Sequence, residues 1–178
     1  MFISKQLKQQ NIAEYLLYMW QVEDLIRAYG CDMDRIREQL VARFPIEQQQ
    51  ELVQWYADLI EMMRREEVMN QGHLQINKNV ITWLTDLHLQ LLASSKFPYY
   101  NAAYYKALPF IVELRAKGAS KEEPELETCF EALYGILLLK LQKKDVGEET
   151  QKAQETITTL LSMLSTYYME DKKGKLEL

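Results

Sequence analysis

Residues 11–29, NIAEYLLYMWQVEDLIRAY, constrain the fold more than any other part of the chain, because a helix built from them would be apolar on nearly every side. At 3.6 residues per turn, Leu16, Met19 and Ile26 lie on the same side as Ile12. Much of the remaining circumference is also apolar, and it is formed by Tyr15, Leu17, Tyr18, Trp20, Val22, Leu25 and Tyr29. A helix of this kind belongs in the interior of a fold. We therefore expect a buried N-terminal helix with later helices packed around it.

Glu23 is the exception within this stretch, because its carboxylate falls on the side of Ile12 where a core residue is expected. Three interpretations remain open. Glu23 pairs with Arg27 one turn later, or it joins a buried hydrogen-bonded network with His88 or a tyrosine hydroxyl. In the third interpretation it lines a pocket as an acid or base, since an apolar environment favours the neutral form of a carboxyl group.

The rest of the sequence predicts an all-α protein. Only 6 Gly and 4 Pro interrupt 178 residues, and no segment alternates at period two as a half-buried strand would. We expect a compact bundle of about seven helices, with residues 1–170 as a single domain and 171–178 as a short, frayed, charged tail.

Turn signals place the helix boundaries. Predicted helices cover residues 4–29, 33–44, 46–70, 74–93 and 98–117, and two more follow Pro124 and the loop at 145–147. Their ends rest on Ser4 as an N-cap, Gly30 and Gly118 as C-terminal stops, Asp32 as a cap, and Pro45 as a break. Pro109, inside the fifth helix, predicts a kink near Tyr105 or a division into two shorter helices.

Charge and cysteine content limit the partners. A net charge of −5 argues against nucleic-acid binding, which relies on clustered Lys and Arg. The only two cysteines, Cys31 and Cys129, are far apart, which suits a reducing compartment or two buried thiols better than a disulfide framework. No apolar run reaches the roughly 20 residues that span a bilayer, and residues 1–10 do not resemble a signal peptide. The expectation is a cytoplasmic protein with no membrane or nucleic-acid partner.

Motifs for catalysis are missing from the sequence. There is no glycine-rich phosphate loop, no HExxH zinc helix, no GxSxG elbow and no EF-hand loop. Neither histidine follows a glutamate by three residues, as a di-iron bundle requires. We therefore predict no metal, cofactor or catalytic residue, and favour a protein that is not an enzyme.

The two histidines are the best remaining candidates for a polar pocket. On one straight helix His73 and His88 would be separated by about 22 Å, too far to share a metal ion. The structural interpretation of His88 is an imidazole at the edge of the core, bonded to a carbonyl or carboxylate, and His73, next to Gly72, could lie in a turn. The candidate pocket consists of Glu23, Arg27, His73 and His88.

Tyrosines suggest a different site. Eleven tyrosines occur in the chain, and such residues are enriched at protein interfaces. Tyr99, Tyr100, Tyr104 and Tyr105 cover two sides of one predicted helix, so some rings must meet solvent, a ligand or another subunit. The candidate interface is formed by these four residues, with a partner subunit as the favoured occupant.

Three segments carry a resemblance to a known family. NIAEYLLYMWQVEDLIRA near the N-terminus, GHLQ at residues 72–75 and LHLQLL at residues 87–92 resemble an uncharacterised family of small helical proteins from Bacteroidetes, known only as a domain of unknown function. The resemblance spans most of the chain and implies an all-helical, bacterial, cytoplasmic protein without transferable catalytic residues.

Two functional hypotheses follow from the sequence. The first is a non-enzymatic protein-interaction or scaffold protein, as a homodimer, that uses an aromatic face around residues 99–105. The second is a small-molecule-binding protein or enzyme with a pocket around Glu23 and His88.

Overall fold

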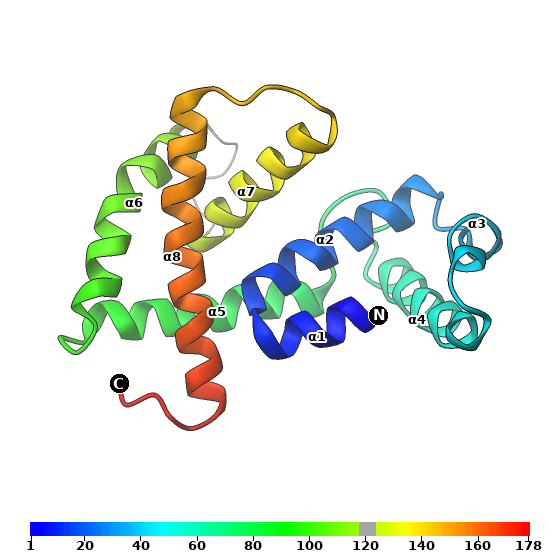
Figure 1. Ribbon diagram of the computed structural model, residues 1–178, viewed down its shortest axis with the longest axis horizontal. Coiled ribbons are helices and arrows are strands. Elements are labelled where there is room, and N and C mark those ends of the chain that lie inside the picture. Colours follow the sequence, from blue (N-terminus) through cyan, green and yellow to red (C-terminus); the bar gives the residue numbers. More distant parts are fainter. Residues whose placement is uncertain (118–123) are drawn as a thin grey trace. The chain divides into compact units, whose positions relative to one another are not determined.

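The computed structural model describes residues 1–117 and 124–178, and in these residues it contains helices and no strand. Figure 1 shows their order along the chain. The elements are α1 (Phe2–Gln10), α2 (Ile12–Ala28), α3 (Met33–Gln39), the 3-10 turn η1 (Val41–Arg43), α4 (Ile46–Arg65), α5 (Gln75–Ala93), α6 (Pro98–Lys117), α7 (Glu125–Leu141) and α8 (Glu148–Lys172). The all-α prediction is confirmed.

Contacts divide the chain into two compact units. The first unit consists of Met1–Gln9 and Glu14–Val80, and the second consists of Gln10–Ala13 and Ile81–Leu178. The expectation of one domain over residues 1–170 stays a prediction.

The predicted first helix is divided into α1 and α2, which accounts for eight α-helices in the described residues where about seven were expected. Ser4 is not an N-cap: it lies inside α1, and its hydroxyl donates a 2.7 Å hydrogen bond to the Met1 carbonyl. The division falls at Asn11, whose side chain accepts a 2.8 Å hydrogen bond from the Ser165 hydroxyl. Asparagine favours helix caps because its side chain competes for backbone hydrogen bonds, so this boundary had a local signal.

Helix α2 is buried, as its sequence predicts. Among its residues only Glu14 and Ala28 are exposed, while Leu16, Ile26 and Trp20 are at most 1% exposed. Gly30 ends the helix in a left-handed conformation with φ of +70°, and the Cys31 amide donates to the Ile26 carbonyl at 2.9 Å. Glycine suits this position because it has no Cβ to clash there.

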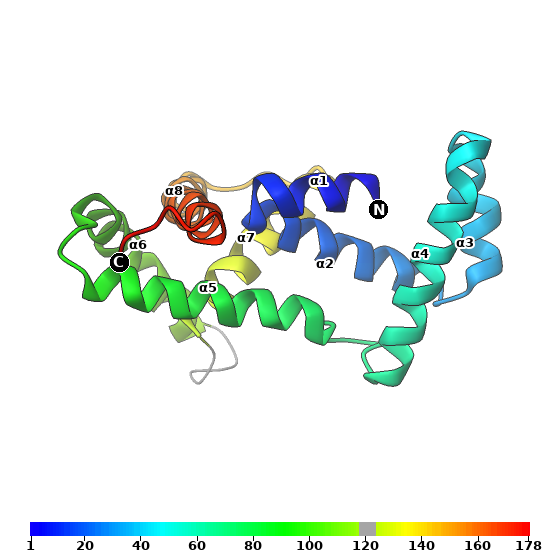
Figure 2. The same ribbon diagram turned by 90° about the horizontal axis from the view of Figure 1, so that it is seen from below.

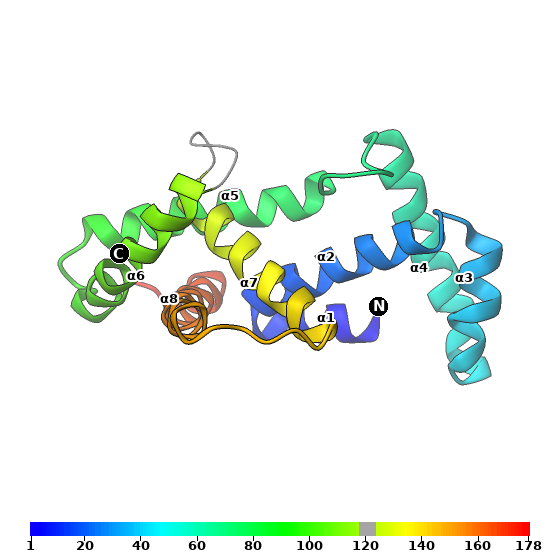
Figure 3. The same cartoon turned by 90° about the horizontal axis from the view of Figure 1, so that it is seen from above.

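The next helices also begin and end at local signals. Asp32 caps α3 by accepting hydrogen bonds from the amides of Asp34 and Arg35. This helix ends at Gln39 instead of Phe44, and the separate 3-10 turn η1 follows it. Helices α3 and α4 lie side by side in all three views (Figures 1, 2 and 3). Helix α4 ends at Arg65, five residues before its predicted end, because Glu67 takes a positive φ of 59° and turns the chain away.

The second unit is built on α6, α7 and α8. Helix α8 packs along α6, and α7 contacts both (Figures 1 and 2). Helix α6 is not divided at Pro109 but runs through it from Pro98 to Lys117. The predicted stop at Gly118 and the turn after it lie outside the described residues. The core of this unit includes large, fully buried side chains from different helices, namely Tyr100, Ile111, Phe130, Leu160 and Leu164.

Among the helices of the described residues, none combines the length and the apolar character that crossing a bilayer would need.

Candidate functional site

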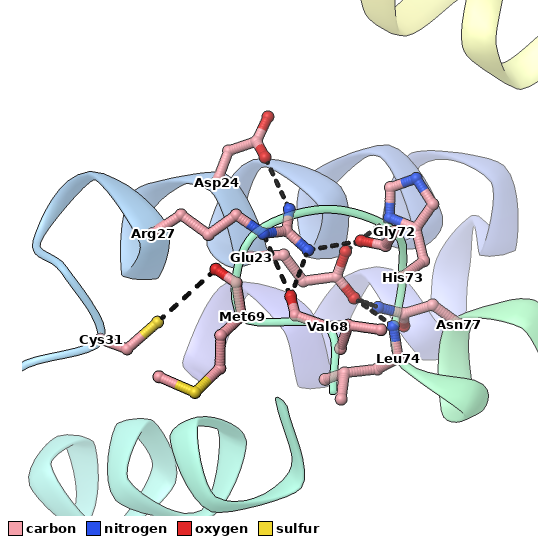
Figure 4. A network of polar contacts seen from close by, with 10 residues as sticks. All are labelled: Glu23, Asp24, Arg27, Cys31, Val68, Met69, Gly72, His73, Leu74 and Asn77. Atoms are coloured by element: carbon pink, nitrogen blue, oxygen red, sulfur yellow. Dashed lines mark hydrogen bonds and ion pairs between the residues drawn. The ribbon is translucent and has the colours of Figure 1, made fainter. Parts of the chain in front are cut away.

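The loop between α4 and α5, residues 66–74, is held against α2 by a network of polar contacts (Figure 4). Glu23 and Arg27 of α2 reach this loop from one side of the helix, four residues apart. Because all of these residues belong to the first unit, the network is a feature of that unit alone.

Glu23 lies at the centre of the network and is 1% exposed. Its Oε1 accepts hydrogen bonds from the Leu74 amide at 2.9 Å and from the Asn77 side-chain amide at 2.6 Å. Its Oε2 lies 2.6 Å from Nδ1 of His73. A buried carboxylate is costly unless hydrogen bonds satisfy it, and here both oxygens have partners.

One of these bonds completes the start of α5. The amides of the first residues of a helix have no partner within the helix, and Leu74, immediately before α5, has no polar side chain to serve as a cap. Glu23 supplies the acceptor for the Leu74 amide, and Glu66 accepts from the Gln75 amide at 2.6 Å. Both carboxylates also lie at the positive end of the helix dipole. Glu23 is therefore a cap for α5 that α2 provides.

His73 is fixed between Glu23 and Trp20. Its ring stacks on the Trp20 indole with centroids 4.1 Å apart and planes inclined by 10°. Its side chain is 26% exposed, and Figure 4 shows the second ring nitrogen pointing away from Glu23. A buried carboxylate thus orients an imidazole that stays partly accessible.

Arg27 does not pair with Glu23. Its guanidinium donates to the Asp24 carboxylate at 2.8 Å, to the Val68 carbonyl at 3.0 and 3.3 Å, and to the Gly72 carbonyl. Of the three interpretations of Glu23, the contacts correspond to a buried hydrogen-bonded network, with His73 in the place expected for His88 or a tyrosine. The Asn77 side chain is fully buried, and its Oδ1 has no hydrogen-bond partner among the residues that the structure describes.

His88 lies in the second unit, whereas Glu23, Arg27 and His73 lie in the first. It is 3% exposed, and its Nδ1 shares a 2.6 Å hydrogen bond with the Tyr100 hydroxyl. Burial lowers the pKa of the His88 imidazole below its usual value, an effect that the charge of Glu125 opposes. Burial also raises the pKa of Tyr100. A neutral histidine and a protonated tyrosine can share this bond, so it is a satisfied core contact with a tyrosine in place of the expected carbonyl or carboxylate.

The four tyrosines of α6 separate into two pairs. Tyr100 is fully buried, and Tyr104 is half-buried with its hydroxyl donating to Glu125 at 2.9 Å. Burial and this hydrogen bond raise the pKa of Tyr104 to about 12. Tyr99 and Tyr105 are 81% and 65% exposed. The sequence prediction that not all four face inward is confirmed.

Tyr99 and Tyr105 belong to a longer apolar surface, which we call the outer face of α6. It consists of the exposed residues Tyr99, Ala102, Tyr105, Pro109, Val112 and Ala116. The inner side of the same helix is apolar too, with Tyr100, Ala107 and Ile111 in the core. The tyrosines alone were predicted to form an interface, although the spacing of the smaller residues at three and four positions already indicated the rest of this face.

Glu23 belongs to no metal site or groove in the described residues. No group of three His, Cys, Asp or Glu side chains there is arranged to hold a metal ion. The first unit carries an open groove of about 520 Å³, but its walls are formed by Cys31, Met33 and residues of α4 such as Arg64, and neither Glu23 nor its hydrogen-bond partners line it.

Comparison with known proteins gives a family match over residues 1–175. The matching family is described as a domain of unknown function (DUF4924). No curated protein and no solved structure matches the chain.

Proposed function

We propose that this chain is a non-enzymatic helical protein that acts through protein contacts. The chain belongs to the family described as a domain of unknown function, so no assigned activity can be transferred to it. The observation that carries this proposal is the outer face of α6, an apolar surface that its own chain leaves exposed.

Burial explains why this surface calls for a partner. Helices that are apolar all round are normally covered on all sides, yet seven apolar residues of α6 are exposed, namely Pro98, Tyr99, Ala102, Tyr105, Pro109, Val112 and Ala116. Single exposed apolar residues are ordinary, but a contiguous set indicates an interaction site. Tyrosine supplies a large apolar ring with a polar tip at little entropic cost, which suits such a site.

The contacts of Glu23 support the same view. A general acid or base needs a free oxygen within reach of a substrate, whereas the oxygens of Glu23 are occupied by Leu74, His73 and Asn77. The carboxylate has a structural task that accounts for its burial.

The alternative, a small-molecule-binding protein or enzyme, rests on the oriented imidazole of His73. A carboxylate that fixes one nitrogen of a histidine leaves the other in position to accept a proton. Ligand-induced stabilisation in a thermal-shift screen, lost in Glu23→Gln and in His73→Gln, would support this function. A screen without such a ligand would count against it.

The proposal also includes a bacterial source and a cytoplasmic location for this protein. The segments that resemble Bacteroidetes proteins support a bacterial source, and two buried, unpaired thiols at Cys31 and Cys129 suit a reducing cytoplasm.

Site-specific photocrosslinking in living cells tests the proposed contact surface. A benzophenone amino acid replaces Tyr105 in the full chain, and the same probe at Thr158, an exposed residue of α8, serves as the control. We expect a protein adduct from position 105 that is absent at position 158 and that disappears when Val112→Glu places a charge on the outer face of α6. Equal labelling at both positions, or an adduct that survives Val112→Glu, would overturn the proposal.

A further inference from the structure

We infer that the occupant of the outer face of α6 is a second copy of this chain, with the two α6 helices packed antiparallel. In this arrangement Tyr105 packs on Ala116 of the second copy, and Lys106 lies beside Glu113 of the second copy. The inference rests on the proposed function and names the partner for that surface.

The spacing of the apolar residues suits a helix as the partner. Ala102, Tyr105, Pro109, Val112 and Ala116 recur at alternating intervals of three and four residues, and all of them are exposed. This is the a and d pattern of a heptad, which aligns one seam of a helix with the seam of another. A flat or irregular partner surface would not require that alternation.

The sizes of these residues favour an antiparallel arrangement. When Tyr105 is opposite Ala116 of the second copy, Pro109 is opposite Val112, so a large side chain meets a small one and two of middle size meet each other. Complementary sizes let facing side chains interdigitate. A parallel pair in register would place Tyr105 against Tyr105 and Ala116 against Ala116, leaving a crowded layer and an empty one.

The charges select the same register. Lys106 and Glu113 follow Tyr105 and Val112 and so occupy the same flank of the seam, one heptad apart, and both are exposed. In antiparallel helix pairs, equivalent flanking positions face each other, so Lys106 approaches Glu113 of the second copy, and the two-fold axis repeats the contact. A shift of one heptad would bring Lys106 toward Lys106. A parallel pair would match Glu113 with Leu108 and Lys106 with Asn101, without any charge pairing.

Lys106 is available for this contact. Within the described residues it forms no ion pair or hydrogen bond through its side chain, whereas Glu113 pairs with Lys117 across one turn. That pair is exposed, with the two side chains 46% and 72% accessible, so Glu113 can also accept from a lysine of a second copy. One flank of the outer face of α6 therefore carries both halves of a self-complementary charge pattern.

Charge reversal and its rescue test the inference on the purified full chain. Sedimentation equilibrium from low micromolar to about 200 µM is expected to show a dimer. Lys106→Glu and Glu113→Lys, each alone, should raise the dimer Kd about tenfold, since each creates two repulsive contacts. The double variant Lys106→Glu/Glu113→Lys should restore the Kd to within about threefold of the parent, because both attractive contacts return with reversed sign.

Two controls separate association from folding and from net charge. Lys152→Glu makes the same charge change on an exposed residue of α8 and should leave the Kd unchanged. Val112→Glu should give a monomer with unchanged helical content by circular dichroism.

Each outcome has a defined meaning. A strictly monomeric parent chain up to about 200 µM, or single reversals that bind as tightly as the parent, would overturn the inference, as would a double variant no better than the single ones. If the parent is monomeric but position 105 still crosslinks to a different protein in cells, the proposed function stands and the second copy is excluded as the partner. If both experiments fail, both proposals fail.

Discussion

Helices α2 and α6 are both apolar around most of their circumference, but they differ in how much of that surface is buried. Helix α2 exposes only Glu14 and Ala28, whereas α6 exposes Tyr99, Tyr105 and Val112. An apolar circumference therefore predicts that a helix will be covered, without indicating whether its own chain or another chain covers it.

The charged side chains on the two helices also differ in burial. Glu23 of α2 is buried and its oxygens are used by the loop before α5, while Lys106 of α6 is exposed and unpaired within the described residues. A buried charge must be satisfied inside the fold because water cannot reach it. An exposed charge is solvated by water and needs no partner within the monomer.

The largest expected effect comes from truncating a large aromatic residue on each helix. Trp20→Ala should destabilise the protein by about 3 to 5 kcal/mol, since it removes a fully buried side chain and leaves a cavity beside His73. Tyr99→Ala should change stability by less than about 0.5 kcal/mol. Urea unfolding measures both, and equal losses would show that the outer face of α6 is covered within the monomer.

Removing the central carboxylate of the first unit should have the next largest effect. Glu23→Ala leaves the Leu74 amide and the Asn77 side chain buried without their acceptor, which should cost about 2 to 4 kcal/mol. Glu23→Gln keeps one acceptor and should lose less. Glu38→Ala, an exposed glutamate of α3, is the control and should stay within about 0.5 kcal/mol of the parent. A loss from Glu23→Ala as small as that of the control would contradict the capping role.

Pro109 offers a gain in stability. It lies inside α6 and has no amide hydrogen to donate to the Tyr105 carbonyl, so Pro109→Ala should stabilise the protein by about 1 to 2 kcal/mol after the entropy of the unfolded chain is included. Pro98→Ala, at the first helical position where proline is favourable, should give no gain. Thermal and urea unfolding can measure both variants. A destabilised Pro109→Ala variant would mean that proline at this place in the outer face supports the folded monomer.

The smallest expected effect is a pH dependence at His88. Its pKa is lowered in the folded protein from the usual value of 6.5, so the unfolded state binds the proton more readily. The stability that the folded protein gains from keeping His88 neutral is therefore fully present above about pH 6.5 and is lost as the pH falls below this value. His88→Gln can still bond to Tyr100 but does not titrate, and the free energy of unfolding should therefore fall less between pH 7 and pH 5 than in the parent. Identical pH profiles would show that His88 is accessible to protons in the folded state.

Local sequence signals were enough for much of the fold and for part of the site. Apolar periodicity predicted the helices and the burial of α2, while Gly30, Asp32 and Pro45 marked boundaries that the structure confirms. The misplaced ends, at Asn11, Gln39 and Arg65, depend on competing hydrogen bonds and backbone turns that periodicity does not report. The candidate residues Glu23, Arg27 and His73 do come together, but His88 has its own partners in the second unit.

From the sequence it follows that this protein is helical, that α2 lies inside, and that Glu23 is a polar exception among core residues, because these properties depend on neighbours within a few residues. The structure adds that Glu23 pairs with His73, fifty residues further along the chain, and that the exposed apolar side of α6 extends beyond the tyrosines to Val112 and Ala116. Those outcomes depend on the path of the loops and on which helices meet, and contacts of that kind leave no periodic trace in a single sequence.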